Sequence, residues 1–184
     1  MQNFEVKRPG PIDCVMHDRP CLAFTEANLK HHLVGLPRSL QWIPPITGGF
    51  KLNIDAALDF KNCTTGLGAI VRNHLGKVVL SSITSFAGLL SPTIAKAKAI
   101  LFGLPMAFKG DISKLALNAD SASIINDLNG NNLMFSGMGL MVEDIHHLVH
   151  QFNGEFSFSF SPRSTNRVAH SLAKLVLIDF CYCF

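Results

Sequence analysis

The chain has 184 residues, of which 48% are hydrophobic and 16% are charged, and its formal net charge is +3. This length and composition predict one packed globular domain with an extension, and they exclude wholesale disorder. The mildly basic charge permits a polyanionic partner without arguing for one.

The chain divides into three predicted parts. Residues 1–48 form an N-terminal extension with a proline-rich linker, because they hold six of the nine prolines and show little periodicity. The stretch WIPPITGG (42–49) leads into a domain over residues 49–180, and residues 181–184 are a C-terminal tail. The start lacks the apolar core of a signal peptide, and no apolar run reaches the roughly 18 residues that span a bilayer. We therefore expect an intracellular protein, nuclear or cytoplasmic, without a membrane partner.

From residue 50 turn residues punctuate the chain regularly, and the runs between them, of which the first and last alternate apolar and polar residues, predict five strands. They cover residues 50–57, 66–73, 78–86, 114–120 and 155–162. Helical spacing predicts four helices, over residues 91–108, 121–130, 137–152 and 164–180. Ser91 and Pro92 suit the start of the first helix, which we expect Pro105 to kink or end. Short turns between the first three strands favour antiparallel pairing, and the later β–α–β order adds parallel strands. The predicted class is α/β (α+β), a mixed five-stranded sheet flanked by helices.

Two acids stand where strands end. Asp55 follows the alternating run Lys51–Ile54. Because Asp is a poor strand former, its presence indicates either that the carboxylate has a function or that the strand ends there. Asp120 follows the fourth strand. The alternative for Asp120 is a structural one, the N-cap of the helix that begins after it.

Four blocks of sequence, in this order, resemble ribonuclease H-like domains. The blocks are KLNIDAA (51–57), GLGAIVRNHLGKVV (66–79), NADSASII (118–125) and SPRSTNRVAHSLAK (161–174). The similarity is to the branch abundant in plants, which is related to the ribonuclease H part of retrotransposon reverse transcriptases, and it covers about residues 42–176. Each block alone is weak, but four in order are specific. The resemblance implies a ribonuclease H-like fold for this domain.

The resemblance also implies a chemistry. Family members hold two Mg²⁺ ions, which Mn²⁺ can replace, and hydrolyse the RNA strand of an RNA–DNA hybrid. By position in the motifs, Asp55, Asp120 and His170 correspond to metal-binding catalytic residues. Candidates for contact with nucleic acid are Asn166, Arg163, Arg167 and Ser121, with Arg72 as a further arginine near the site.

One catalytic position departs from the family. The third acid of the family lies in the first helix, and Lys96 stands there; the segment 81–110 contains no Asp or Glu. A protonated amine repels divalent cations and has no lone pair to donate. Ala56 also replaces the glycine that usually follows the first acid. We therefore expect lost or severely reduced hydrolysis, with Lys96 forming an ion pair to Asp55 or Asp120 in a metal-free pocket.

Three functions follow from this pattern. The first is a nucleic-acid-binding ribonuclease H-like domain that is impaired or inactive as a nuclease. The second is an active Mg²⁺-dependent endonuclease of RNA–DNA hybrids that tolerates Lys96. The third is a non-catalytic protein-interaction module on the same scaffold, because a fold by itself does not fix a function.

Two further groups of residues have spacings compatible with metal binding. Cys14, His17 and Cys21 could hold zinc but match no common zinc-finger spacing, and the alternative is a loosely packed extension. His146 and His150 share a helix face, for which a solvated polar surface is the alternative.

Overall fold

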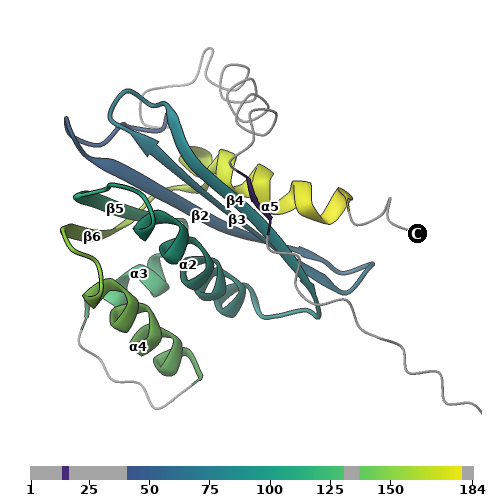
Figure 1. Cartoon of the computed structure of the whole chain (residues 1–184). Helices are drawn as coiled ribbons and strands as arrows, with labels where there is room; N and C mark the ends of the chain where they lie inside the picture. Colours follow the sequence, from purple (N-terminus) through teal and green to yellow (C-terminus); the bar gives the residue numbers. More distant parts are fainter. Residues whose placement is uncertain (1–13, 17–40, 131–136, 180–184) are drawn as a thin grey trace, which may run out of the picture.

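The computed structural model describes residues 14–16, 41–130 and 137–179 (Figure 1). The strands are β1 (Cys14–Met16), β2 (Phe50–Asp59), β3 (Thr64–Asn73), β4 (Val78–Ala87), β5 (Lys114–Ala119) and β6 (Glu155–Phe160). The helices are α2 (Pro92–Phe108), α3 (Ala122–Asn129), α4 (Gly137–His150) and α5 (Arg167–Asp179), and a short 3-10 turn covers Arg163–Thr165. None of the helices in these ranges is long and apolar enough to cross a membrane.

The strands form one mixed sheet in the order β1-β4-β3-β2-β5-β6. β2, β3 and β4 are an antiparallel meander, whereas β5 pairs in parallel with both β2 and β6. The five predicted strands are confirmed, each with ends within two residues of the prediction. β1, which was not predicted, adds a sixth strand by pairing antiparallel with the outer edge of β4.

Helices cover both faces of the sheet (Figure 1). On one face α2, α3 and α4 bury the larger apolar cluster, which includes Leu52 and Ile54 of β2. On the other face α5 packs over the meander, where Ala169 and Leu172 contact Ile70 of β3. Since successive strand residues point to opposite faces, Asn53 and Asp55 lie on the α5 side of the sheet. The burial pattern of β2 thus places its polar residues beside α5.

Helix α2 starts as predicted but does not end at its proline. The Ser91 hydroxyl accepts a hydrogen bond from the Ile94 N–H at 3.4 Å, and Pro92 opens the helix. The helix continues through Pro105 to Phe108, the predicted end, so of the two effects expected of Pro105, a kink or an end, the structure excludes the end. Pro105 itself is exposed, while Met106 and Ala107 beyond it are buried. Their packing holds the last turn in place after the proline has removed one hydrogen bond.

Two glycines of β3 let α5 approach the sheet closely. A Cβ atom at Gly68 would lie 2.6 Å from the Ala169 carbonyl oxygen and 2.6 Å from the Ala173 backbone nitrogen. A Cβ atom at Gly66 would likewise clash with α5, at the Ala173 carbonyl oxygen. Because both contacts at Gly68 are with backbone, side-chain movement alone cannot relieve them. The absence of a side chain at Gly68 therefore allows the short distance between α5 and the sheet.

We expect Gly68→Ala to lower the free energy of unfolding by about 2 kcal/mol, because the methyl group forces α5 away from β3. Gly137→Ala is the matched control, since nothing lies within 4 Å of a Cβ atom built there. Urea denaturation followed by circular dichroism measures both variants. Equal stability of the Gly68→Ala variant and the wild type would contradict this packing of α5.

Candidate active site

Asp55 and Asp120 converge between the neighbouring interior strands β2 and β5. Asn53 of β2 and Asn118 of β5 are paired in the parallel ladder, and each acid lies two residues further along the chain, Asp55 within β2 and Asp120 directly after β5. Both carboxylates are largely buried, with side chains that are 2% and 5% exposed. The cap of α3 is Ser121 and not Asp120, so the structural alternative for Asp120 does not hold.

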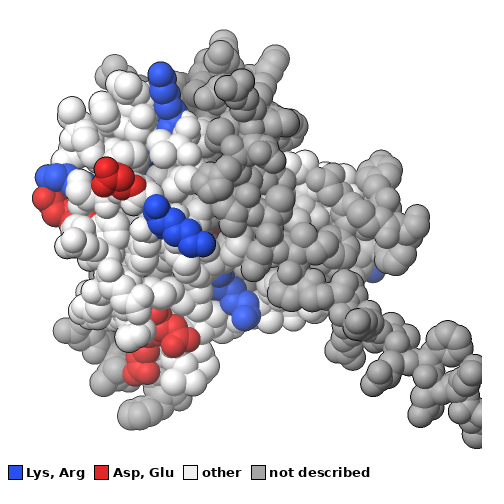
Figure 2. All heavy atoms as spheres, viewed as in Figure 1, with Lys and Arg blue, Asp and Glu red and all other residues white. Residues whose placement is uncertain are grey.

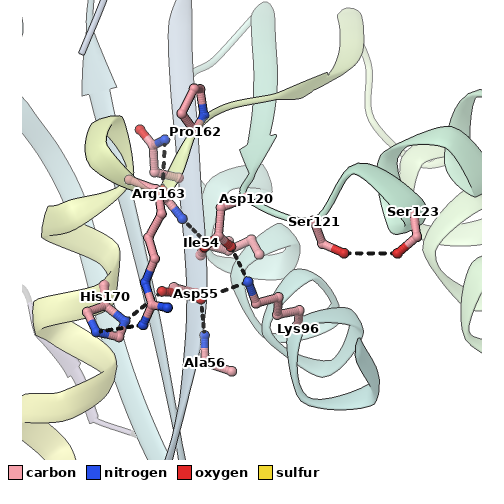
Figure 3. A network of polar contacts seen from close by, with 12 residues as sticks. Ile54, Asp55, Ala56, Lys96, Asp120, Ser121, Ser123, Pro162, Arg163 and His170 are labelled. Carbon is pink, nitrogen blue, oxygen red and sulfur yellow. Dashed lines mark hydrogen bonds and ion pairs between the residues drawn. The ribbon is translucent and has the colours of Figure 1, made fainter. Parts of the chain in front are cut away.

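Lys96 lies between the two acids (Figure 3). From helix α2 its ammonium forms an ion pair and hydrogen bond with Oδ1 of Asp120. The same Nζ is 3.8 Å from Oδ1 of Asp55. The side chain of Lys96 is 19% exposed, so this cation reaches both buried carboxylates from the rim of the site. The sequence predicted an ion pair with one acid or the other, and the structure has both.

His170 and Arg163 complete the polar network on the α5 side (Figure 3). Nδ1 of His170 is 2.8 Å from Oδ2 of Asp55, and Nη2 of Arg163 is 3.4 Å from Nε2 of His170. A guanidinium only donates hydrogen bonds, so Nε2 of His170 accepts and Nδ1 carries the proton that goes to Asp55. His170 is thereby oriented by groups on both sides of its ring.

Burial raises the pKa of Asp55 above its ordinary value, and the nearby charge of Asp120 raises it further. The Ala56 N–H, which donates to Oδ1 of Asp55 at 2.9 Å, opposes the rise, as do the charge of Lys96 and that of His170 when its ring is protonated. Burial and the second acid outweigh these three favourable partners. The ionised form of Asp55 is therefore disfavoured by folding.

We expect Asp55→Asn to remove a pH dependence of stability. Below the ordinary carboxyl pKa of 3.8 Asp55 is protonated in both states and contributes nothing. As pH rises from there through the raised folded pKa, the unfolded state loses its proton first, so the wild-type free energy of unfolding falls. The amide of the variant does not titrate. Urea denaturation across this window checks the result, and a wild-type-to-variant difference that is constant with pH would contradict it.

Asn166 is buried in a network behind the two acids. Its side-chain nitrogen donates to the Ile54 carbonyl at 2.7 Å, and its oxygen accepts from Nδ2 of Asn53 at 3.1 Å. Oδ1 of Asn53 in turn accepts from Nε1 of Trp42 at 3.0 Å and from Nη2 of Arg72 at 2.8 Å. The amide of Asn166 thus ties the start of α5 to β2, next to Asp55.

Arg72 does not contact nucleic acid as the sequence suggested, because it is 1% exposed. Its guanidinium carbon lies 3.7 Å from the centroid of the Trp42 ring, a stacked cation–π arrangement. Burial lowers the pKa of Arg72 to about 9, so the group is still charged at neutral pH. Sequence reasoning missed this buried cation, and Trp42, the single tryptophan of the chain, was the available signal.

The site opens into a pocket of about 880 Å³. Four of the predicted site residues line it, namely Asp55, Lys96, Arg163 and His170. Arg167 and Ser121 do not line it: Arg167 is exposed at the start of α5, and the Ser121 hydroxyl is 3.2 Å from that of Ser123. Lys174 also lines the pocket and was missed, although it lies four residues after His170 and so on the same face of α5.

The residues present do not fit a two-metal centre. Asp55 and Asp120 supply the oxygen ligands that Mg²⁺ prefers, but the ammonium of Lys96 already contacts both carboxylates. The four side chains Asp55, Lys96, Asp120 and His170 carry a net charge of one negative with His170 neutral, which is little to balance two divalent ions. Within the described ranges, no group of three or more His, Cys, Asp and Glu side chains is arranged to hold a metal ion.

The other metal-compatible patterns gain no support. His17 and Cys21 lie outside the described residues, and only Cys14 of that pattern falls in a described strand, β1. His146 donates from Nε2 to the Leu128 carbonyl at 2.9 Å and so connects α4 to α3. The prediction of a solvated polar surface was therefore wrong for His146, while His150 is exposed.

Comparison with known proteins agrees with the fold of this chain. The family model described as reverse transcriptase-like matches residues 53–176. Ribonuclease H1 from the halophilic archaeon Halobacterium salinarum superposes with a TM-score of 0.63 at 21% identity, over 71% of this chain and 98% of that chain. The N-terminal ribonuclease H domain of a Mycobacterium tuberculosis protein superposes with a TM-score of 0.61 at 20% identity, over 72% of this chain and 96% of that chain. LC11 ribonuclease H1 was isolated from compost, and its structure was solved in complex with an RNA/DNA hybrid. It superposes with a TM-score of 0.63 at 15% identity, over 72% of this chain and 99% of that chain. A search of curated proteins finds no match. The chain therefore belongs to the reverse transcriptase-like family, and its fold is that of the ribonucleases H.

Proposed function

We propose that this protein is a ribonuclease H-like domain that binds nucleic acid and has lost most or all of its capacity to hydrolyse RNA–DNA hybrids. One observation carries the proposal: the ammonium of Lys96 contacts both Asp55 and Asp120. A cation that is covalently part of the chain occupies the place next to the carboxylates where divalent ions would have to bind. Asp55, Asp120 and His170 then retain the family positions without the family chemistry.

Binding of nucleic acid is supported by the family and by the cations of the pocket. The LC11 ribonuclease H1 structure contains an RNA/DNA hybrid. In this chain Arg163 and Lys174 line the pocket beside Lys96 and are the groups we assign to phosphate contacts, with Arg167 and Ser121 at its periphery. On the face that Figure 2 shows, Lys and Arg side chains lie apart from one another and form no continuous basic band. We therefore expect modest affinity that falls steeply with salt.

A binding and cleavage assay on one labelled RNA–DNA hybrid tests the proposal. With Mg²⁺ or Mn²⁺ present, the wild type is expected to shift the hybrid at low salt and to leave it intact. Asp55→Asn is expected to leave both results unchanged. Robust wild-type cleavage that Asp55→Asn abolishes would establish the active endonuclease instead. Absence of binding at low salt would point to the protein-interaction module.

A further inference from the structure

The pocket that contains Asp55 has a charged part and an apolar part. Its charged residues are three cations and two carboxylates, and one of the cations, Lys96, is already paired with Asp55 and Asp120. The charged residues of the pocket are Lys96, Arg163, Lys174, Asp55 and Asp59. The apolar part includes Leu58, Phe60, Pro92, Leu177 and Ile178. A concave site with this mixture suits a ligand that combines an anionic group with a flat apolar one.

Phe60 is an exposed aromatic ring on a well-fixed turn. It is 73% exposed, the highest value among the large apolar side chains of the described residues. The turn that follows it is held by Asp59, whose Oδ1 accepts from the N–H groups of Lys61 at 3.0 Å and Asn62 at 3.1 Å. Oδ2 of Asp59 accepts from the side-chain amide of Asn62 at 2.6 Å. These bonds engage the Asp59 carboxylate within its own turn and keep the ring at the pocket wall.

From these features we infer that the pocket takes a single-stranded polynucleotide, with backbone phosphate near Arg163 and Lys174 and an unpaired base stacked on Phe60. The inference rests on the proposed function and narrows its ligand. Proteins bind single strands by this combination of cations that follow the backbone and aromatic rings that stack on bases. Lys96 is already paired with Asp55 and Asp120, so Arg163 and Lys174 supply the positive charge for a phosphate, and this binding needs no divalent cation.

A duplex does not satisfy the apolar part of the pocket. In a base-paired hybrid the faces of the bases are stacked on one another, and the protein meets only phosphates, sugars and groove edges. Such a ligand would leave Phe60 and Ile178, which is 57% exposed, uncovered. An unpaired base covers this surface while its phosphate reaches the cations. The single strand is therefore the better match to both parts of the pocket.

Fluorescence anisotropy at low salt with a chelator tests this inference. The probes are a short unstructured labelled RNA and the same RNA annealed to DNA. The variants are Phe60→Ala and, as a matched control, Phe160→Ala, which removes a ring that is 51% exposed on β6 and does not line the pocket. Circular dichroism confirms that the variants are folded.

We expect the wild type to bind the single strand more tightly than the hybrid. Phe60→Ala should weaken single-strand binding about tenfold, the loss of one stacked base, and leave hybrid binding unchanged. Phe160→Ala should change neither. Hybrid binding that equals or exceeds single-strand binding, with no effect of Phe60→Ala, would overturn the inference and leave the proposed function standing. If neither probe binds, the proposed function fails as well, and the pocket would then be assigned to a protein partner.

Discussion

Lys96→Met is expected to lower the free energy of unfolding by about 3 kcal/mol at neutral pH, because removing one partner of a buried ion pair leaves an uncompensated charge. Methionine keeps an unbranched apolar stem of similar length, so packing is largely preserved. What is lost is the positive charge that holds together Asp55 and Asp120, whose side chains are 2% and 5% exposed. Urea denaturation at neutral pH measures the change.

The pH dependence separates this charge effect from simple loss of packing. In acid, Asp55, whose pKa is raised by burial and by the charge of Asp120, loses its own charge and no longer needs the ammonium. The difference between wild type and Lys96→Met should then shrink. Lys98→Met is the control on the same helix, where an exposed lysine is replaced and a change of about 0.5 kcal/mol or less is expected. A loss that is the same in acid as at neutral pH would attribute the effect to packing.

Lys96→Glu is expected to raise hydrolysis of an RNA–DNA hybrid by on the order of a hundredfold over the wild-type background, the size of effect that a single well-placed electrostatic group has on catalysis. The substitution removes the competing cation and supplies the third carboxylate at the position where the family has one. His170, already hydrogen-bonded to Asp55 at 2.8 Å, needs no rearrangement. The assay is cleavage of a labelled hybrid with Mg²⁺ or Mn²⁺.

Two controls accompany the Lys96→Glu cleavage assay. Lys98→Glu places the same new carboxylate on the exposed side of α2 and should remain at background. Adding Asp55→Asn to Lys96→Glu should remove the gained activity. Wild-type cleavage as fast as that of Lys96→Glu would show that the ammonium is no obstacle, and the account of the site would fail.

The sheet was predictable because its strands alternate between two differently covered faces. β2 carries polar residues toward α5 and apolar residues toward α2, which gives the two-residue period. β1 was not predicted, since Cys14–Met16 is three residues long and too short to show a period. Its place depends on the free edge of β4, a feature of the fold that no local pattern reveals. Pro105 does not end α2, one of the two effects expected of it, because burial of the last turn outweighs the local cost of the proline.

The convergence of the site residues was predictable from motif order, but their connections were not. Asp55, Asp120 and His170 could be placed together because each occupies a recognised block, and Lys96 because it stands in the first helix where the resemblance implies the third acid. That one ammonium contacts both acids depends on the position of α2 over β2 and β3, which the sequence does not specify. The burial of Arg72 was missed for a related reason, because an isolated arginine in a strand has the same pattern whether it faces solvent or lies under an aromatic ring.

Calorimetric titration with Mn²⁺ and Mg²⁺ tests the central claim most directly, namely that the Lys96 ammonium replaces divalent ions at the two acids. Wild-type protein is compared with Lys96→Glu under identical conditions. We expect no binding heat beyond dilution for the wild type and saturable binding by Lys96→Glu. Saturable wild-type binding that Asp55→Asn abolishes would contradict it.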